Sequence, residues 1–523
     1  MKNIFNILIK PLVPIAVVLG MSACQNDLNL SPIDPNVDLS FKQDEVFNKL
    51  YATMALTGQQ GPAGVGDVAG IDEGQSGFYR LIFTANEYPT DEAYCHWGDA
   101  GIPDFYQMNW GSSNIPLEGL YGRLNYDVVL CNHFLDNTNG SSDENTVRQR
   151  AEARFIRALN YFYLMDIFGN VPFSTSVSAD LPQQIKREDL FVFIENEFLE
   201  ILPDMYEPRQ APFGRADKAA CWLMLARMYL NAEVYTGNAR WSDAITYANY
   251  VIGSGYELCP NYKELFMADN DENERAKQEI ILSIRQNGAT TQSYSGSQFL
   301  ICATHGDVMT AWGSNDSWSG VRARPTLVNK FFPASTPPLG FDEEQMVSAA
   351  GDDRALLFSG GDRTLEIPQG TGDFKNGFAV AKWTNVRSDG GATSHVTYAD
   401  TDIPFLRLGE AYLILAEATY RNGGQKQDVL DALNELRDRA HVTRLADIAS
   451  ADVILDEWAR EMYFEAHRRM DLVRFGYFTG NGYLWEWKGG IAEGTAVPST
   501  YNVYPIPASD LNVNRNLVQN QGY

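Results

Sequence analysis

Aromatic side chains stand in parts of this chain that are rich in glycine and serine, where an interior is hard to build. Tyr294 lies in the run S-Y-S-G-S, and Trp318 lies in G-S-N-D-S-W-S-G. Flat rings at a surface, beside groups that form hydrogen bonds, can stack on sugar rings and bind their hydroxyls. Core filling is the alternative for each aromatic residue, and it is evenly balanced for Trp97 and Trp312. The candidates for this chemistry are Asp72, Glu73, Arg80, Trp97, Tyr294, Trp312 and Trp318.

Two acidic clusters offer a different chemistry. Residues 269–274 read D-N-D-E-N-E, and residues 400–402 read D-T-D. Oxygen donors at this density are the ligands that calcium prefers, although no glycine stands where an EF-hand loop needs one. A solvated acidic loop is the alternative. The candidate calcium ligands are Asp271, Glu272, Asp400 and Asp402.

Motifs of known catalytic sites are missing from the sequence, which has no H-E-x-x-H, no G-x-S-x-G and no P-loop. Glu461 and Glu465 lie one helical turn apart, so they could act as the acid and base of a glycoside hydrolase. We favour an ion-pair network that fixes the last helix, because charged side chains at these spacings usually pair with each other. The neighbouring charged residues are Arg460, Arg468, Arg469, Asp471 and Arg474.

The charge of the chain excludes one class of partner. It carries 67 Asp and Glu against 41 Lys and Arg, which gives a net charge of −26. Nucleic acid is excluded, because phosphate binding needs a basic face. Such a surface favours neutral or cationic partners.

The N-terminus predicts export and a lipid anchor. An apolar run at residues 11–19 follows lysines and ends before small residues and Cys24, and it is too short to span a bilayer. We predict a signal peptide at residues 1–23, whose end resembles a lipoprotein cleavage box with Cys24 as the lipidated residue. An ordinary signal peptidase site is the alternative. Residues 24–39 have the composition of a flexible stalk.

Most of the chain is predicted to be helical, and these helices must hold the candidate residues in place. The clearest one covers residues 145–168, where a wide aromatic stripe recurs at helical spacing before Gly169 and Pro172 end the helix. Such a stripe must be covered by other helices. Large and small residues alternate across helix pairs, as in tetratricopeptide-like stacking. Further helices are expected at residues 38–57, 115–135, 187–205, 214–232, 241–252, 405–421, 427–439 and 453–475.

Residues 261–404 have a different composition. They are richer in Gly, Ser, Asn and Asp, and they contain short apolar runs at residues 280–284 and 378–383. We therefore predict a mainly α protein with tetratricopeptide-like helical repeats over about residues 40–260 and 405–480. Between them lies an irregular, loop-rich insertion with short strands, on one face of the helical body.

Several stretches together resemble the SusD/RagB family of outer-membrane glycan-binding lipoproteins, and most closely its starch-binding members. They follow the family's order from the stalk to the last residue, so their joint presence is more specific than any single motif. The matching stretches are residues 152–172, 205–220, 214–232, 265–274, 406–418, 433–440, 456–475 and 504–523.

The resemblance implies a SusD-like domain at residues 40–523, built on tetratricopeptide-like units. It also implies a protein that is not an enzyme, is exposed on the cell outer membrane, captures oligosaccharide and delivers it to a TonB-dependent porin of the SusC type. Arg80, Tyr294 and Trp318 fall where starch-binding members contact sugar. The calcium ion of these relatives implies a structural Ca²⁺ at the acidic clusters.

One segment departs from the pattern of the starch-binding members. They have a second tryptophan at the position of Cys95 and an asparagine near Ala100, and the loop at residues 94–102 is shorter here. With one tryptophan fewer, the aromatic rings of the site would follow a different curve. The resemblance therefore does not determine the linkage of the bound glucan. We predict a surface lipoprotein that binds α-glucan; the alternatives are another glucan such as dextran, a surface glycoside hydrolase, and a lid that gates the porin without binding glycan.

Overall fold

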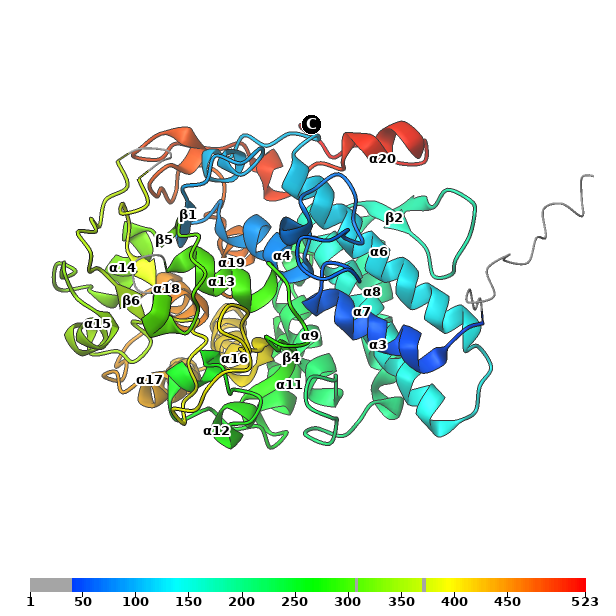
Figure 1. Ribbon diagram of the computed structural model, residues 1–523, viewed down its shortest axis with the longest axis horizontal. Helices are drawn as coiled ribbons and strands as arrows, with labels where there is room; N and C mark the ends of the chain where they lie inside the picture. Colours follow the sequence, from blue (N-terminus) through cyan, green and yellow to red (C-terminus); the bar gives the residue numbers. More distant parts are fainter. Residues whose placement is uncertain (1–39, 306–308, 369–372) are drawn as a thin grey trace, which may run out of the picture. The chain divides into compact units, whose positions relative to one another are not determined.

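Helices dominate the structure and strands form only short pairs (Figure 1). The computed structural model describes residues 40–305, 309–368 and 373–523. The predicted signal peptide at residues 1–23, the lipidated Cys24 and the stalk at residues 24–39 lie outside the described residues. The chain divides into two units, Met1–Gln43 and Asp44–Tyr523, and the second contains all the candidate sugar and calcium ligands.

The prediction of a mainly helical fold is confirmed. Among the described residues, no helix combines the length and the apolar character needed to cross a membrane. The 3₁₀ helices cover Glu73–Gln75, Leu202–Asp204, Tyr262–Phe266, Met309–Trp312, Lys488–Gly490 and Ser499–Asn502. The α-helices are α3 (Gln43–Ala55), α4 (Phe78–Glu87), α5 (Pro103–Gln107), α6 (Ile115–Asn137), α7 (Glu144–Phe168), α8 (Arg187–Ile201), α9 (Lys218–Leu230), α10 (Ala232–Thr236), α11 (Trp241–Ile252), α12 (Glu274–Lys277), α13 (Gly296–Thr304), α14 (Pro325–Phe331), α15 (Glu343–Ala350), α16 (Leu408–Arg421), α17 (Lys426–Arg439), α18 (Ala451–Met462), α19 (Arg468–Arg474) and α20 (Ala508–Val513).

The longest helix, α7, is the centre of one helical layer. The Asp143 side chain accepts a hydrogen bond from the Thr146 backbone at its start, and Gly169 ends it with a φ of 72°. Neighbours α6 and α8 pack on it, and the series α9, α11, α16 and α17 packs in the same pairwise way. From Ala151 to Phe168 every residue except Arg154 is buried. The aromatic stripe is therefore covered, as its composition requires.

Within residues 40–305, 309–368 and 373–523 the strands form four antiparallel pairs, and two of these pairs join segments more than a hundred residues apart. The pair of β4 and β8 closes the two ends of the insertion on each other, and its first strand matches the apolar run predicted at residues 280–284. The strand pairs are β1 (Ala93–Cys95) with β5 (Val321–Ala323), β2 (Val171–Phe173) with β3 (Gln183–Ile185), β4 (Ile280–Ile284) with β8 (Ile403–Arg407), and β6 (Leu357–Phe358) with β7 (Ala379–Val380).

The insertion is less loop-like than its composition predicts. Helix α13 begins at Gly296, inside the glycine- and serine-rich run, and all its residues are buried. Trp383, in the second apolar run, is fully buried as well. The small residues of the glycine- and serine-rich run therefore allow close helix packing as well as loops. Only part of the insertion is available for a surface site.

The helix predicted at residues 453–475 is divided in two, α18 and α19. Phe464 and Ala466 between them have φ values of 59° and 64°. The Lys382 ammonium donates to the Tyr463 carbonyl, and the Trp383 indole donates to the Phe464 carbonyl. Side chains from the insertion thus bind carbonyls that a continuous helix would use, and the backbone turns at this point.

Candidate functional site

Five of the seven predicted sugar-binding residues line one open cavity of about 460 Å³. This volume lies in the range of small-ligand pockets. The five are Asp72, Arg80, Trp97, Tyr294 and Trp318, and Gly74, Gln75, Asp99 and Asp316 complete the lining.

The pair of β1 and β5 brings Trp97 and Trp318 to the same end of a strand ladder. Cys95 is opposite Val321, and the His96 amide donates to the Gly320 carbonyl over 2.8 Å. The Trp97 indole nitrogen then donates to the Ser319 carbonyl over 3.0 Å. Two short strands therefore place rings that are more than two hundred residues apart in sequence side by side at the cavity.

Arg80 lies among the rings of the cavity. Its Cζ is 4.7 Å from the ring centroid of Phe299 and 5.5 Å from the centroids of Trp97 and Trp318. The rings attract the guanidinium through their negative faces, although burial lowers the pKa of Arg80. An arginine keeps its charge at any physiological pH. The site therefore holds one fixed positive charge with hydrogen-bond donors.

Tyr294 joins two segments of the cavity. Arg80 Nη1 donates to the carbonyls of Gly74 and Tyr294 over 3.1 and 3.0 Å. A Cβ at Gly74 would lie 2.8 Å from the Tyr294 Cβ, so only glycine permits this approach. The Tyr294 ring centroid is 5.9 Å from that of Trp318, and the Tyr398 hydroxyl donates to the Tyr294 hydroxyl over 3.2 Å.

Carboxylates add acceptors to the cavity. Asp316 accepts a hydrogen bond from the Trp318 indole over 3.0 Å, and Asp72 and Asp99 lie in the same lining. Aromatic rings, acceptors and one guanidinium together suit a neutral ligand with many hydroxyls. Sequence reasoning missed Asp99, Asp316 and Tyr398, because loop positions without periodicity give no signal of which residues meet.

Trp312 and Glu73 do not line this cavity. Trp312 is 6% exposed, and its ring packs 5.4 Å from Phe358 in a separate cluster with Ala379 and Ala381. Glu73 accepts hydrogen bonds from the Thr57 hydroxyl and from the Ala63 amide, so it fixes the first loop. The structure therefore separates both residues from the site to which the sequence assigned them.

Cys95, the departure from the starch-binding pattern, is fully buried in β1. Burial raises its pKa to about 12. Cys95 is not among the residues that line the cavity, whereas Trp97 and Trp318 are. The thiol therefore packs inside the protein and does not contribute to the aromatic lining of the cavity.

Asp271 and Asp402, two of the predicted calcium ligands, both form ion pairs with the side chain of Arg285. Arg285 Nη2 lies 2.7 Å from an Asp271 oxygen, and its Nε lies 2.8 Å from an Asp402 oxygen. Asp402 also accepts the Gln286 amide over 2.6 Å. Burial raises the pKa of Asp402 to about 7 in spite of the arginine.

The other two predicted ligands are also engaged elsewhere. Glu272 pairs with Arg387 over 2.6 Å, and Asp400 accepts hydrogen bonds from the backbone amides of Gly288 and Ser394. Within residues 40–305, 309–368 and 373–523, no three Asp, Glu, His or Cys side chains gather as a metal ion requires. These residues, as arranged, do not fit a calcium ion, and calcium stays a prediction.

Chelation tests this disagreement. We expect EGTA to leave the thermal midpoint of unfolding unchanged, because Arg285 already compensates the charges of Asp271 and Asp402. Differential scanning fluorimetry in EGTA and in CaCl₂ measures it. A midpoint that falls in EGTA and is restored by CaCl₂, but not by MgCl₂, would contradict the expectation and establish the ion.

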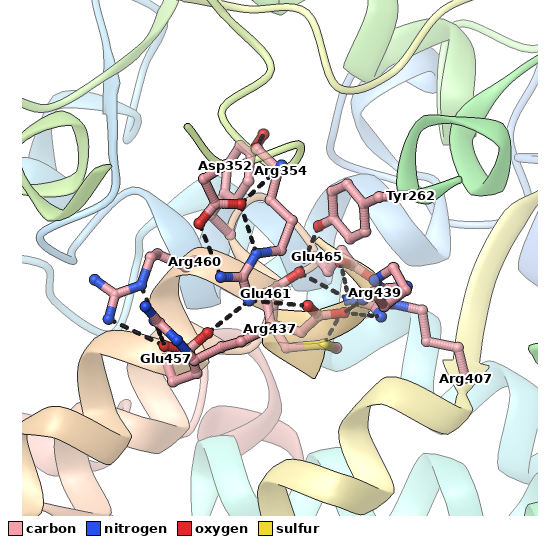
Figure 2. Close-up of polar contacts among 12 residues, drawn as sticks. Tyr262, Asp352, Arg354, Arg407, Arg437, Arg439, Glu457, Arg460, Glu461 and Glu465 are labelled. Carbon is pink, nitrogen blue, oxygen red and sulfur yellow. Dashed lines mark hydrogen bonds and ion pairs between the residues drawn. The ribbon is translucent and has the colours of Figure 1, made fainter. Parts of the chain in front are cut away.

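Glu461 and Glu465 lie in a buried ion-pair network (Figure 2). Arg407 Nη1 is 2.6 Å from a Glu461 oxygen, and Arg407 Nε donates to Glu465 over 2.8 Å. Burial alone would raise the pKa of Glu461, but the guanidinium groups of Arg439, Arg407 and Arg354 hold it well below its usual range. Carboxylates paired in this way cannot reach a substrate, so the favoured network is confirmed over an acid–base pair.

The partners in this network differ from those predicted. Arg439 comes from α17 and Arg407 from β8, and Lys382 pairs with Glu465 over 2.6 Å. Two of the expected arginines do pair within their own helices, Arg460 with Glu457 and Arg474 with Asp471. The distant pairs are Arg468 with Asp91, Arg469 with Asp166, and Arg474 with Glu417.

Comparisons with known proteins agree with this architecture. Residues 358–523 match the SusD family, and residues 85–230 match a family described as "Starch-binding associating with outer membrane". The chain is 51% identical to the starch-binding protein SusD of Bacteroides thetaiotaomicron, over 96% of each chain. A SusD-like carbohydrate-binding protein from Bacteroides fragilis superposes with a TM-score of 0.70 at 20% identity, covering 91% of this chain and 98% of that one. Surface glycan-binding protein A from Bacteroides thetaiotaomicron, in complex with laminarihexaose, gives 0.66 at 17% identity, with coverage of 91% and 98%.

The structure has the helical SusD-like fold, and one cavity in it is lined by aromatic rings. The chain belongs to the SusD family. The prediction of the family is therefore confirmed, and with it the class of non-enzymatic binding proteins. The second matching family description associates its members with the outer membrane.

Proposed function

We propose that this protein binds α-glucan chains at the outer membrane without cleaving them. The observation that carries the proposal is the convergence of Trp97, Tyr294 and Trp318 around Arg80 at one open cavity. Rings stack on the apolar faces of glucose units, while Arg80 and the carboxylates bind hydroxyls. The relative that shares half of the sequence is a starch-binding protein, which supports α-glucan as the ligand class.

The anchor and the transport partner belong to the same proposal. Cys24 carries the lipid, and the protein delivers captured oligosaccharide to a TonB-dependent transporter of the SusC type. Family membership supports both steps. A lipid anchor keeps the protein near the transporter and raises its effective concentration there.

An affinity-gel panel tests the proposal. Purified protein is run in native gels containing amylopectin, pullulan or dextran, and we expect retardation in amylopectin. Retardation in dextran alone would identify the ligand as a 1,6-linked glucan. The structure is compatible with either linkage, because Cys95 is buried and adds no ring to the cavity. No retardation in any gel would contradict glucan binding. Incubation with maltoheptaose should give no shorter products, and their appearance would show a hydrolase.

Gly320 gives a prediction about how the site is built. Its φ is 99°, and a Cβ there would lie 2.2 Å from the Trp97 indole nitrogen. We expect Gly320→Ala to displace Trp97, weaken retardation in amylopectin several-fold and cost about 1–2 kcal/mol of stability. Gly98→Ala is the matched control, because a Cβ at Gly98 meets no atom within 4 Å. Equal retardation of both variants and wild type would remove Trp97 from the site.

A further inference from the structure

The charged side chains that line the cavity around Arg80 do not balance. Among the described residues, this lining contains the carboxylates of Asp72, Asp99 and Asp316 and a single basic side chain, that of Arg80. The carboxylates come from three separate segments, namely the first loop, the loop after β1 and the loop before β5. Aspartate is ionised at neutral pH, so the lining has three negative charges against one positive charge.

No basic side chain compensates these carboxylates by direct contact. In the part of the chain that the structure describes, none of the three forms an ion pair with lysine or arginine. Asp316 accepts the Trp318 indole N–H, and Asp72 and Asp99 are exposed. The buried carboxylate of Asp402, by contrast, lies 2.8 Å from an arginine nitrogen. A ligand in the cavity around Arg80 therefore meets uncompensated negative charge.

Arg80 is poorly placed to receive an anion. Its Nη1 already donates to the carbonyls of Gly74 and Tyr294. A Cβ at Gly74 would lie 3.4 Å from Asp72 Oδ1 and 3.7 Å from Arg80 Nη1, so the carboxylate and the guanidinium face the same small space. Burial lowers the pKa of Arg80, while the negative charges of Asp72 and Asp99 act to raise it. An anion that approaches the guanidinium therefore also approaches carboxylates that repel it.

We propose that this cavity selects uncharged glucan segments and rejects segments that carry carboxylate or phosphate groups, an inference that rests on the proposed function. Its carboxylates accept hydrogen bonds from the hydroxyls of a neutral sugar and repel an anionic substituent. The anionic substituent would also lose water without gaining an unshared cation. Specificity then comes from a repulsive element placed beside the attractive rings.

Two matched ligands separate charge from shape. Maltoheptaose oxidised at C6 to carboxylates is compared with its methyl ester, which has the same backbone and similar bulk but no charge. Isothermal titration calorimetry gives the ratio of the two dissociation constants. At low salt we expect the wild type to bind the ester at least about tenfold more tightly than the carboxylate form. Added NaCl should reduce this ratio, because salt screens exposed charges.

The double variant Asp72→Asn with Asp99→Asn tests which charges are responsible. Asparagine keeps an acceptor oxygen of similar shape and removes the charge. We expect the ratio of the two dissociation constants to fall by about threefold to tenfold relative to wild type. Asp316 is kept, because its carboxylate holds the Trp318 indole in place.

Glu233→Gln with Glu435→Gln is the matched control, because both side chains are exposed and neither lines the cavity. It changes the net charge of the protein by the same amount and should keep the wild-type ratio. The inference is wrong if wild type binds the ester and the carboxylate form equally, if the aspartate variant keeps the wild-type ratio, or if the control lowers the ratio as much. In each of these cases binding of unmodified maltoheptaose still supports the proposed function, whereas its absence contradicts that function itself.

Discussion

Trp318→Ala is expected to reduce the affinity for amylopectin by at least about tenfold while the protein stays folded. The ring lies 5.9 Å from Tyr294 and 5.5 Å from the Arg80 guanidinium, so it contacts both groups that we assign to the ligand. Aromatic anchors at the centre of a binding site typically contribute about 2 kcal/mol or more. The side chain is only partly buried, and its backbone amide keeps its hydrogen bond to Cys302, so the loop should remain in place.

Affinity-gel retardation measures the loss, and the thermal midpoint shows that the fold survives. Trp222→Ala is the matched control, because Trp222 has a similar partial burial on α9 but packs on Tyr250 and does not line the cavity. It should keep wild-type retardation. If Trp318→Ala is retarded as strongly as Trp222→Ala, Trp318 makes no contact with the glucan.

Local sequence patterns were sufficient to predict the elements that depend on local chemistry. The α7 helix has its aromatic stripe, its Asp143 cap and the Gly169 stop within one continuous stretch, and its predicted range matches the structure closely. The apolar run at residues 280–284 is a strand for the same reason. Arg80, Tyr294 and Trp318 were assigned to one site through the family resemblance, and the structure brings them together at one cavity.

Contacts between distant segments could not be predicted from the sequence. Trp312 and Trp318 stand in the same glycine- and serine-rich stretch, yet one packs on Phe358 and the other on Tyr294. Nothing in their local composition distinguishes the two. Tyr398 joins the site through a hydroxyl pair across 104 residues, which periodicity cannot reveal.

The ion-pair network shows the same limit more sharply. Spacing along one helix correctly indicated that Glu461 would be paired, but it suggested partners on that helix. The partners Arg407, Arg439 and Arg354 instead come from other parts of the fold. Tertiary packing therefore decides which arginine meets which carboxylate, and this gives Arg407 a role that its sequence position does not suggest.

Arg407→Met is expected to destabilise the protein by about 3–5 kcal/mol, because it leaves buried carboxylates without their cation. Arg407 is fully buried, and it pairs with Glu279, Glu461 and Glu465 over 2.6 to 3.0 Å. It also donates to the Glu461 carbonyl over 2.8 Å, close to the turn between α18 and α19. Methionine fills much of the space but supplies no donor, so the network loses both charge and hydrogen bonds.

Guanidinium-induced unfolding of the two arginine variants measures the effect. Arg444→Met makes the same chemical change at an exposed pair with Asp438, where solvent screens the charges, so its unfolding midpoint should stay close to that of wild type. The difference between the two midpoints isolates burial from charge removal. Equal midpoints would mean that Glu461 and Glu465 take up protons or find other cations when Arg407 is lost, and that the network is not what holds α18 to β8.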